Sequence, residues 1–388
     1  MKQYFRTVLG CATLMLLLAD CKQVYDPRIG AKNIRLLVVE GFLNSGQGAT
    51  VVRLSRTGDL TDTTIHLELG AQVNVEGDDN SNFPLVDNAN GEYSIPQLNL
   101  NNNVKYRLHI KTIDGKEYVS DYSSVKYTPA IDSITSQREN GGAQFYVNAH
   151  DPQIAAKYYQ WKYEETWEFH SAYYSSLLYT RDSRTNRVTD VAYRDAFHNV
   201  DTTIYKCWKT FNSSSIILGS TEKLTSDVVY LPVQYIEPHS EKLGILYSLN
   251  LRQYAISHEA YLFLQKIKKN TEQLGSIFDA QPSELSGNIH CLTDPNEIVI
   301  GFAEVSQEQT KRIFVYNSQF PDWNYDPGCV RIEIDNNLDS IAKYGADLLP
   351  ATPSRLSSLG GIIAFYASTP PCVDCTLKGT NQKPDFWP

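Results

Sequence analysis

The sequence is poor in histidine and has no excess of positive charge. Its 388 residues include eight histidines and two methionines, and the formal net charge is −9. A protein that binds nucleic acid needs a basic face to release counterions, so we expect no nucleic-acid partner. The histidines are scattered without the spacing of metal ligands, and we expect neither a metal nor a cofactor.

Familiar catalytic motifs are also missing. His258-Glu259 is not followed by the second histidine that an HExxH zinc site needs, and no GxSxG elbow or Walker loop is present. Ser220-Thr221-Glu222-Lys223 spells SxxK, but its companion motifs are missing. We therefore expect a protein that is not an enzyme.

The N-terminus has the pattern of an export signal. Lys2 and Arg6 precede an apolar run over residues 8–19, which is too short to form a stable membrane span. No later apolar run reaches spanning length. We therefore predict a signal peptide over residues 1–20 and a body outside the bilayer.

The signal ends in a lipoprotein-like motif. Leu18-Ala19-Asp20-Cys21 resembles the lipobox of bacterial lipoproteins, although Asp20 stands where a small residue is usual. This motif predicts lipidation of Cys21, which would hold the protein to a membrane without a transmembrane helix. The alternative is simple secretion, with Cys21 as an ordinary thiol. Residues 21–33 have little periodicity and are predicted to be a tether.

Short strands separated by Gly, Asn and Asp follow the tether. They are predicted over residues 36–43, 50–55, 71–76, 92–95 and 106–111. Asp114-Gly115, between Ile113 and Tyr118, is typical of a tight hairpin. This spacing predicts a β-sandwich over residues 34–128, similar to immunoglobulin-like and transthyretin-like sandwiches.

Residues 129–388 are predicted to form a larger β-rich domain with one inserted amphipathic helix. The helix is expected at about residues 257–274, with Ser257 as its N-cap and Gly275 after its end. Residues 181–201 have no clear period and are predicted to be a long loop or an insertion. A second loop over residues 276–288 contains Phe278, a candidate contact residue.

One predicted strand in this domain has an aromatic face. Alternate positions from residue 159 form a row interrupted by one carboxylate, namely Tyr159, Trp161, Tyr163, Glu165, Trp167 and Phe169. A buried carboxylate needs a partner, and arginines such as Arg194 and Arg252 are available. Glu165 is therefore either half of a structural ion pair or a ligand-binding group in an aromatic groove. A catalytic acid is the third alternative, but no second carboxylate can be placed opposite it.

Five cysteines follow Cys21, and an oxidising compartment favours disulfides between them. They are Cys207, Cys291, Cys329, Cys372 and Cys375. The CxxC pair could close on itself or reach any of the other three. Zinc binding with a helper such as His290, and redox catalysis, are alternatives. The odd number leaves one thiol over or one bond outside the chain.

The chain resembles the bacterial domain-of-unknown-function family 4249. The matching pieces are Leu37-Val38-Val39-Glu40-Gly41, Tyr159 to Glu168, Cys207-Trp208, Lys269 to Glu272, Ser276 to Asp279, Gly287-Asn288-Ile289 and Cys372 to Cys375 with Lys383-Pro384. The resemblance implies an outer-membrane lipoprotein encoded near a TonB-dependent receptor, with an accessory role in uptake. It assigns no catalytic residues.

Our leading hypothesis is a lipid-anchored outer-membrane protein, on the periplasmic or the cell-surface face. It would bind ligand or cap the barrel for a TonB-dependent transporter. The aromatic row and the loop with Phe278 are the first candidates for contact surfaces. A surface adhesin or assembly component is the alternative, and a glycan-acting hydrolase is a third.

Overall fold

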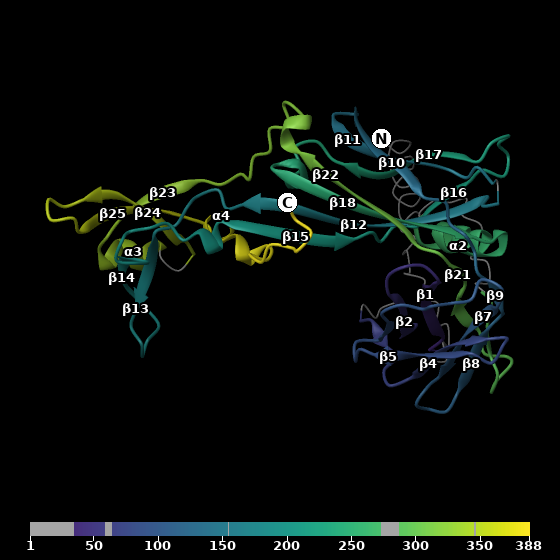
Figure 1. Ribbon diagram of the computed structural model, residues 1–388. Coiled ribbons are helices and arrows are strands. Elements are labelled where there is room, and N and C mark those ends of the chain that lie inside the picture. The colour runs from purple at the N-terminus through teal and green to yellow at the C-terminus, as the bar shows by residue number, and fades with distance from the viewer. Residues whose placement is uncertain (1–34, 59–63, 154, 273–286, 345–346) are drawn as a thin grey trace, which may run out of the picture.

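The computed structural model describes residues 35–58, 64–153, 155–272, 287–344 and 347–388. Within these ranges the protein is mainly β, as predicted, and Figure 1 shows an elongated arrangement. A β-sandwich lies at one end and a long central sheet extends away from it. A small group of strands and one short helix, which we call the distal module (residues 172–201 and 329–368), lies at the other end. No helix in the described ranges is long and apolar enough to cross a membrane.

The sandwich is built from the short strands that the sequence predicts. They are β1 (Leu37–Asn44), β2 (Thr50–Arg56), β3 (His66–Leu67), β4 (Gln72–Gly77), β5 (Asn82–Asp87), β6 (Glu92–Ile95), β7 (Lys105–Lys111), β8 (Glu117–Ser120) and β9 (Ser123–Ser124). Alternate residues of β7 are buried, because a strand with one face on a core exposes every second side chain. The hairpin between β7 and β8 is confirmed, with Gly115 at a φ of 86°.

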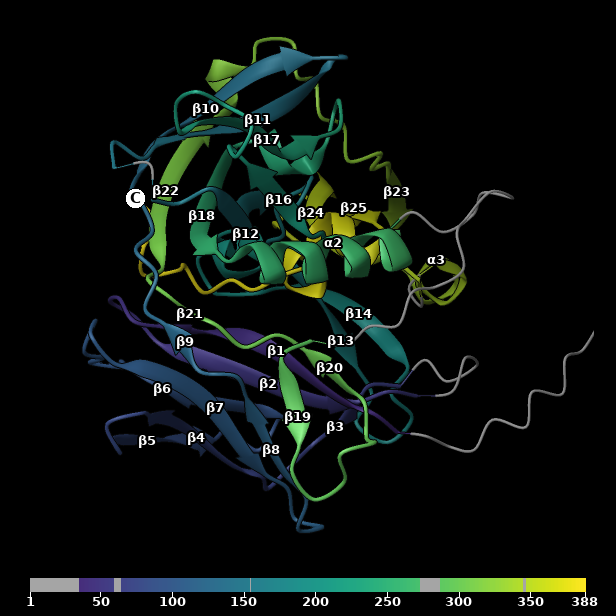
Figure 2. The same ribbon diagram turned by 90° about the vertical axis from the view of Figure 1, so that its right-hand side faces the viewer.

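The chain returns to the sandwich late in the sequence. The strands β19 (Ile289–Cys291), β20 (Val299–Gly301) and β21 (Val305–Ser306) pair with β8 and β1, which lie beside them in Figure 2. Gly301 allows this approach, since a Cβ there would lie 2.6 Å from the Val39 carbonyl oxygen. The sequence pattern groups these residues with the second domain, but their backbone pairs with strands of the first.

The central sheet is built around two long strands. β12 (Tyr158–His170) and β18 (Leu246–Ile256) pair antiparallel from Tyr158↔Ile256 to Glu168↔Leu246. The strands β15 (Lys206–Asn212), β16 (Ile217–Ser220) and β22 (Gln309–Tyr316) complete the sheet. A second layer contains β10 (Ile131–Glu139), β11 (Gly142–His150) and β17 (Val228–Ile236). Side chains of both layers form the largest buried cluster.

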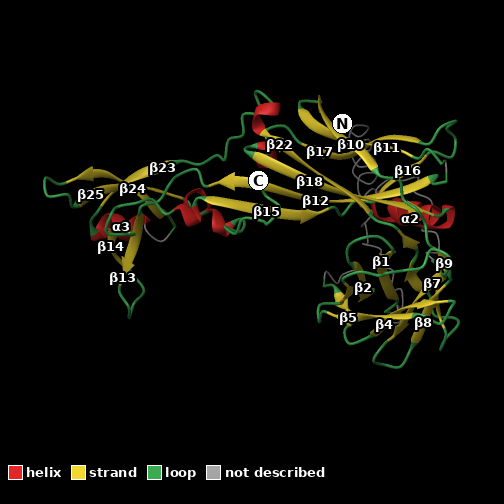
Figure 3. Cartoon of the chain, viewed as in Figure 1, coloured by secondary structure: helices red, strands yellow, loops and turns green. Residues whose placement is uncertain are grey.

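The predicted amphipathic helix is α2 (His258–Glu272), the longest helix in the described part of the chain (Figure 3). Ser257 Oγ accepts a hydrogen bond of 3.1 Å from the Ala260 backbone nitrogen, which confirms the predicted N-cap. Ala260 and Phe263 are its buried residues. Residues 273–286, which include the predicted helix end and Phe278, lie outside the described ranges.

The distal module contains strands where we expected a loop. β13 (Leu177–Arg181) and β14 (Val188–Tyr193) form a hairpin, so the predicted loop over residues 181–201 is wrong. The hairpin shows no sequence period because its strands bury little beyond Leu177 and Val191. These two residues pack on the sheet of β23 (Arg331–Asp335), β25 (Ile362–Ser368) and β24 (Leu349–Leu356) and on α3 (Leu338–Tyr344).

The C-terminal tail lies along the central sheet. It starts with the short helix α4 (Pro370–Val373), and Thr380 forms a β-bridge with Trp208. Near the end, Trp387 is buried against Trp208 and Leu246. The C-terminal tail is therefore docked on the central sheet.

Candidate functional site

The aromatic row of β12 is part of the protein core. Tyr159 and Trp161 have no exposed surface, and Tyr163 and Trp167 are also buried. The row packs against Phe145 and other apolar side chains of the second layer. Because these rings are enclosed by the protein itself, they offer no open groove, and our hypothesis of direct ligand contact along this row is corrected.

Glu165 is half of a structural ion pair. Lys242 Nζ lies 2.6 Å from Glu165 Oε1, while Gln234 Nε2 and the Tyr247 hydroxyl each donate a hydrogen bond of 3.0 Å to Oε2. The partner is a lysine from the turn before β18, not one of the arginines we considered. The carboxylate is thus compensated by charge and by hydrogen bonds, as a buried charge requires. The burial of Tyr247 and its hydrogen bond to Glu165 raise the pKa of the tyrosine well above its usual value.

A small cavity of about 170 Å³ lies between the end of β12 and the turn before β18. Two carboxylates, Glu168 and Glu241, line it. Burial favours a higher pKa for Glu168, but bonds from His170, Lys206 and Trp387 outweigh it and lower the pKa to about 2.

The second carboxylate of this cavity is also held ionised. Burial of Glu241 is outweighed by Lys378 at 2.8 Å and the Tyr325 hydroxyl at 3.0 Å, which lower its pKa. A glycosidase needs one carboxyl group with a raised pKa as its general acid. Neither Glu168 nor Glu241 meets this requirement.

The structure selects among the disulfide pairings that the sequence left open. Cys207 is bonded to Cys375 and Cys329 to Cys372, while Cys291 is a buried free thiol in the sandwich. Cys372 lies in the short helix α4, and Cys375 begins a separate 3-10 turn (Cys375–Leu377). Both sulfurs of this CxxC pair are in disulfides, so in this structure they are neither zinc ligands nor a redox dithiol.

The distal module exposes large apolar side chains. Leu359 is 97% exposed at the tip of the β24–β25 hairpin, and Phe197 is 85% exposed after β14. Val330 and Leu338 are also largely exposed. Such a group on a small module is typical of a contact surface. Sequence reasoning missed it, although Leu359 beside Gly360-Gly361 is an apolar residue at a turn position.

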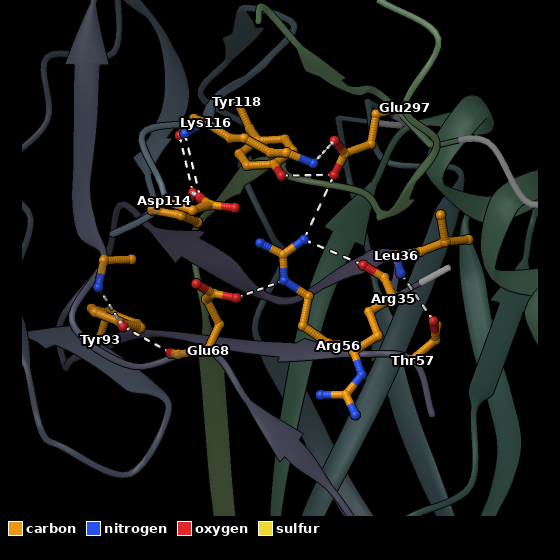
Figure 4. Close-up of polar contacts among 12 residues, drawn as sticks. Arg35, Leu36, Arg56, Thr57, Glu68, Tyr93, Asp114, Lys116, Tyr118 and Glu297 are labelled. Carbon is orange, nitrogen blue, oxygen red and sulfur yellow. Dashed lines mark hydrogen bonds and ion pairs between the residues drawn. The ribbon is translucent and has the colours of Figure 1, made fainter. Parts of the chain in front are cut away.

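A second surface lies on the sandwich, where the described chain begins. An open hollow of about 480 Å³ is lined by Arg35, Arg56, Glu68, Leu69, Ile113, Asp114 and Lys116. Figure 4 shows the polar groups around it. These residues come from the start of the described chain, from β2, from the segment after β3 and from the β7–β8 hairpin.

Arg56 is the central cation of this hollow. Its Nε lies 2.6 Å from Glu68 Oε2, and its Nη1 lies 3.6 Å from Glu297 Oε1 and donates to the Arg35 carbonyl (Figure 4). Burial would lower the pKa of Arg56, but hydrogen bonds to Glu68 and Tyr118 raise it. The guanidinium thus stays charged and ties β2 to the returning segment that carries Glu297.

Lys116 and Asp114 are charged at neutral pH as well. The Lys116 ammonium bonds to Glu297, which raises the lysine pKa, and the Thr112 hydroxyl bonds to Asp114, which lowers the carboxyl pKa. The hollow is therefore lined by three cations and two carboxylates. No motif in the sequence marks this site, although Ile113 beside Asp114-Gly115 places an apolar residue at a hairpin tip.

Comparisons with known proteins add little about function. No curated protein matches the sequence. A chitinase, ChiA74 from Bacillus thuringiensis, aligns at 11% identity and a TM-score of 0.15 over 49% of this chain and 29% of its own, so the chain spans less than a third of that protein. The B domain of a biofilm-associated protein aligns at 6% identity and a TM-score of 0.15, over 73% of this chain and 86% of its own. Likenesses this weak carry no argument.

The family comparison is informative. The model of a domain of unknown function, DUF4249, matches residues 22–312. The match covers most of the chain and includes the sandwich, the aromatic strand β12 and helix α2. The chain belongs to the DUF4249 family.

Proposed function

We propose that this protein is a lipoprotein of the outer membrane, anchored through Cys21, that serves as a non-enzymatic accessory of a TonB-dependent transporter. The distal module is the surface that contacts the transporter. The proposal combines the lipobox-like motif with the distal module, which lies at the end of the molecule away from the sandwich (Figure 1) and exposes large apolar side chains.

The observation that carries the proposal is the exposure of large apolar side chains on a module that is held by a disulfide. Leu359 and Phe197 are largely exposed, and the Cys329–Cys372 disulfide ties the segment before β23 to the helix after β25, which fixes the base of the β23-β25-β24 sheet. A rigid element loses little conformational entropy on binding, so it can present apolar anchors to a partner at low cost. The buried aromatic row of β12 then has a structural role, as a stiff connection between the sandwich and this module.

Site-specific photo-crosslinking tests the contact. A photoreactive amino acid at position 359 is expected to capture a β-barrel protein of the outer membrane in intact cells. The matched control is position 224, where Leu224 is also exposed but lies outside the distal module. Capture at both positions, or at neither, contradicts the proposed contact.

The anchor is tested separately. Metabolic labelling with a fatty-acid analogue should mark the wild-type protein, and Cys21→Ser should abolish the label. Unlabelled wild-type protein released into the medium would contradict the anchor and leave simple secretion as the alternative.

A role in surface assembly or adhesion is the second candidate. Strand β23 is an edge of the β23-β25-β24 sheet and is paired on one side only within the described chain. An edge strand of this kind can accept a strand from another protein. Deletion of the gene would then impair attachment without affecting growth on any nutrient, whereas a transport accessory predicts the opposite result.

A glycan-acting hydrolase is the least favoured alternative, because Glu165 is enclosed by Lys242, Gln234 and Tyr247. Any hydrolytic activity found in the purified protein should be unchanged by Glu165→Gln. A loss of turnover in this variant, with its stability retained, would revive the hypothesis.

A further inference from the structure

The hollow on the sandwich is bordered by apolar side chains that face solvent. Ile65, Leu67 and Leu69 alternate along the segment around β3, and all three are exposed. Alternate residues of an extended segment point to the same side. Ile113, which is 76% exposed, lies over Gly70, since a Cβ built there would be 2.5 Å from Ile113 Cδ1. The hairpin tip and the β3 segment therefore form one apolar border.

The hollow has no excess of negative charge, although the chain has a formal net charge of −9. Three cations and two carboxylates line it, and the neighbouring Glu297 pairs with Arg56 and Lys116. Arg35 is exposed, and its side chain has no hydrogen-bond or ion-pair partner within the described residues. An exposed arginine without a partner among the described residues, beside exposed aliphatic side chains, suits phospholipids, which present phosphate groups above their acyl chains.

The position of this surface in the chain indicates which partner covers it. Arg35 follows Cys21 by 14 residues, which can span at most about 50 Å. A lipid attached at Cys21 would thus keep the hollow close to the membrane, and the described chain enters the sandwich at this hollow.

We propose that this face of the sandwich rests on an anionic phospholipid surface, with Ile113 and Leu69 among the upper acyl groups and Arg35 near the phosphates. The inference rests on the lipid anchor of the proposed function. It adds an orienting contact, which sets how the body stands on the membrane to which Cys21 attaches it.

Vesicle co-sedimentation tests the contact without the anchor. The protein is the mature chain, residues 21–388, with Cys21→Ser, because acyl chains would hide a weaker contact. The vesicles are phosphatidylcholine alone or phosphatidylcholine with about one third phosphatidylglycerol. We expect clear binding to the anionic vesicles, weaker binding to the neutral ones, and a decrease at high salt.

Two variants probe the two parts of the surface. Ile113→Asp is expected to weaken binding by about tenfold, because the apolar side chain is lost from the interface. Arg35→Glu reverses one charge and should also weaken binding by about tenfold. The matched controls are Leu359→Ser and Arg184→Glu, which change an exposed leucine and an exposed arginine in the distal module and should bind as the parent does.

The outcomes decide between the proposals. Absence of binding by the parent, or equal binding by all four variants, overturns the membrane contact. Crosslinking at position 359 uses the lipidated protein and a different surface, so it can succeed or fail independently. Capture of a barrel at position 359 together with failed vesicle binding would leave the proposed function standing and remove only this contact.

Discussion

The indole nitrogen of Trp387 donates a hydrogen bond of 3.1 Å to Glu168 Oε2, across a sequence separation of 219 residues. Trp387 is buried between Trp208 and Leu246, so the penultimate residue of the chain helps to close the core beside β12. The contact couples the C-terminal tail to the strand that leads toward the distal module.

We expect Trp387→Ala to lower the free energy of unfolding by about 3–5 kcal/mol, because a large side chain is removed from a packed site. Denaturant unfolding of the purified protein measures this change. Leu377→Ala is the control in the same tail, and its exposed side chain predicts a change within about 0.5 kcal/mol. Equal effects of the two substitutions would show that the tail is not docked in solution.

The ionisation of Glu168 should stabilise the protein at neutral pH. Its pKa is about 2 in the folded protein, below its usual value of 4.5, so the folded state favours the charged form. This contribution is fully present above pH 4.5 and is lost as the pH falls toward 2. The substitution Glu168→Gln removes this pH-dependent contribution to the free energy of unfolding.

Unfolding free energies measured between pH 7 and pH 2 test this expectation. The variant should be less stable than the wild type at pH 7, and the difference should shrink steadily below pH 4.5. Parallel curves over this whole range would mean that Glu168 has no depressed pKa. Since both proteins keep Glu241 and the other carboxylates, the difference between the curves isolates Glu168.

The Glu165–Lys242 ion pair predicts that losing the lysine alone destabilises the protein more than losing both charges. Lys242→Met leaves the Glu165 carboxylate without its charge partner, at a cost of about 2 kcal/mol after allowance for the partial exposure of the lysine. Adding Glu165→Gln to Lys242→Met should recover part of this loss, because the uncompensated charge is removed. Additive losses in the double variant, measured by denaturant unfolding, would argue against direct coupling.

The disulfides predict how many thiols react in the unfolded, unreduced protein. Of the five cysteines beyond residue 21, only Cys291 should be alkylated, as counted by mass spectrometry. Removal of the Cys329–Cys372 bond with paired Ser substitutions should destabilise the protein by about 2–4 kcal/mol, since it closes a 43-residue segment. Alkylation at Cys372 or Cys375 in the wild type would contradict this connectivity.

Local chemistry explains the elements that sequence reasoning predicted. The alternation of β12, the Ser257 cap of α2 and the hairpin at Asp114-Gly115 each depend on residues within a few positions of one another. Strand period, helix capping and turn conformation are properties of short segments, so the sequence expresses them directly. The hairpin of β13 and β14 was missed because its strands have mostly exposed side chains, which leave no period to detect.

The sequence by itself determined a mainly β protein that has a strand with an aromatic face and one capped helix. Tertiary structure alone decided that Lys242 would meet Glu165, that Cys375 would meet Cys207, and that the strands within residues 289–306 would rejoin the sandwich. Each of these contacts joins positions far apart in the chain. The sequence offers several cations that could pair with Glu165 and several cysteines that could bond to Cys375, and nothing local distinguishes them. Packing of the whole chain selects the partner, because only one arrangement buries the apolar faces and satisfies the charges together.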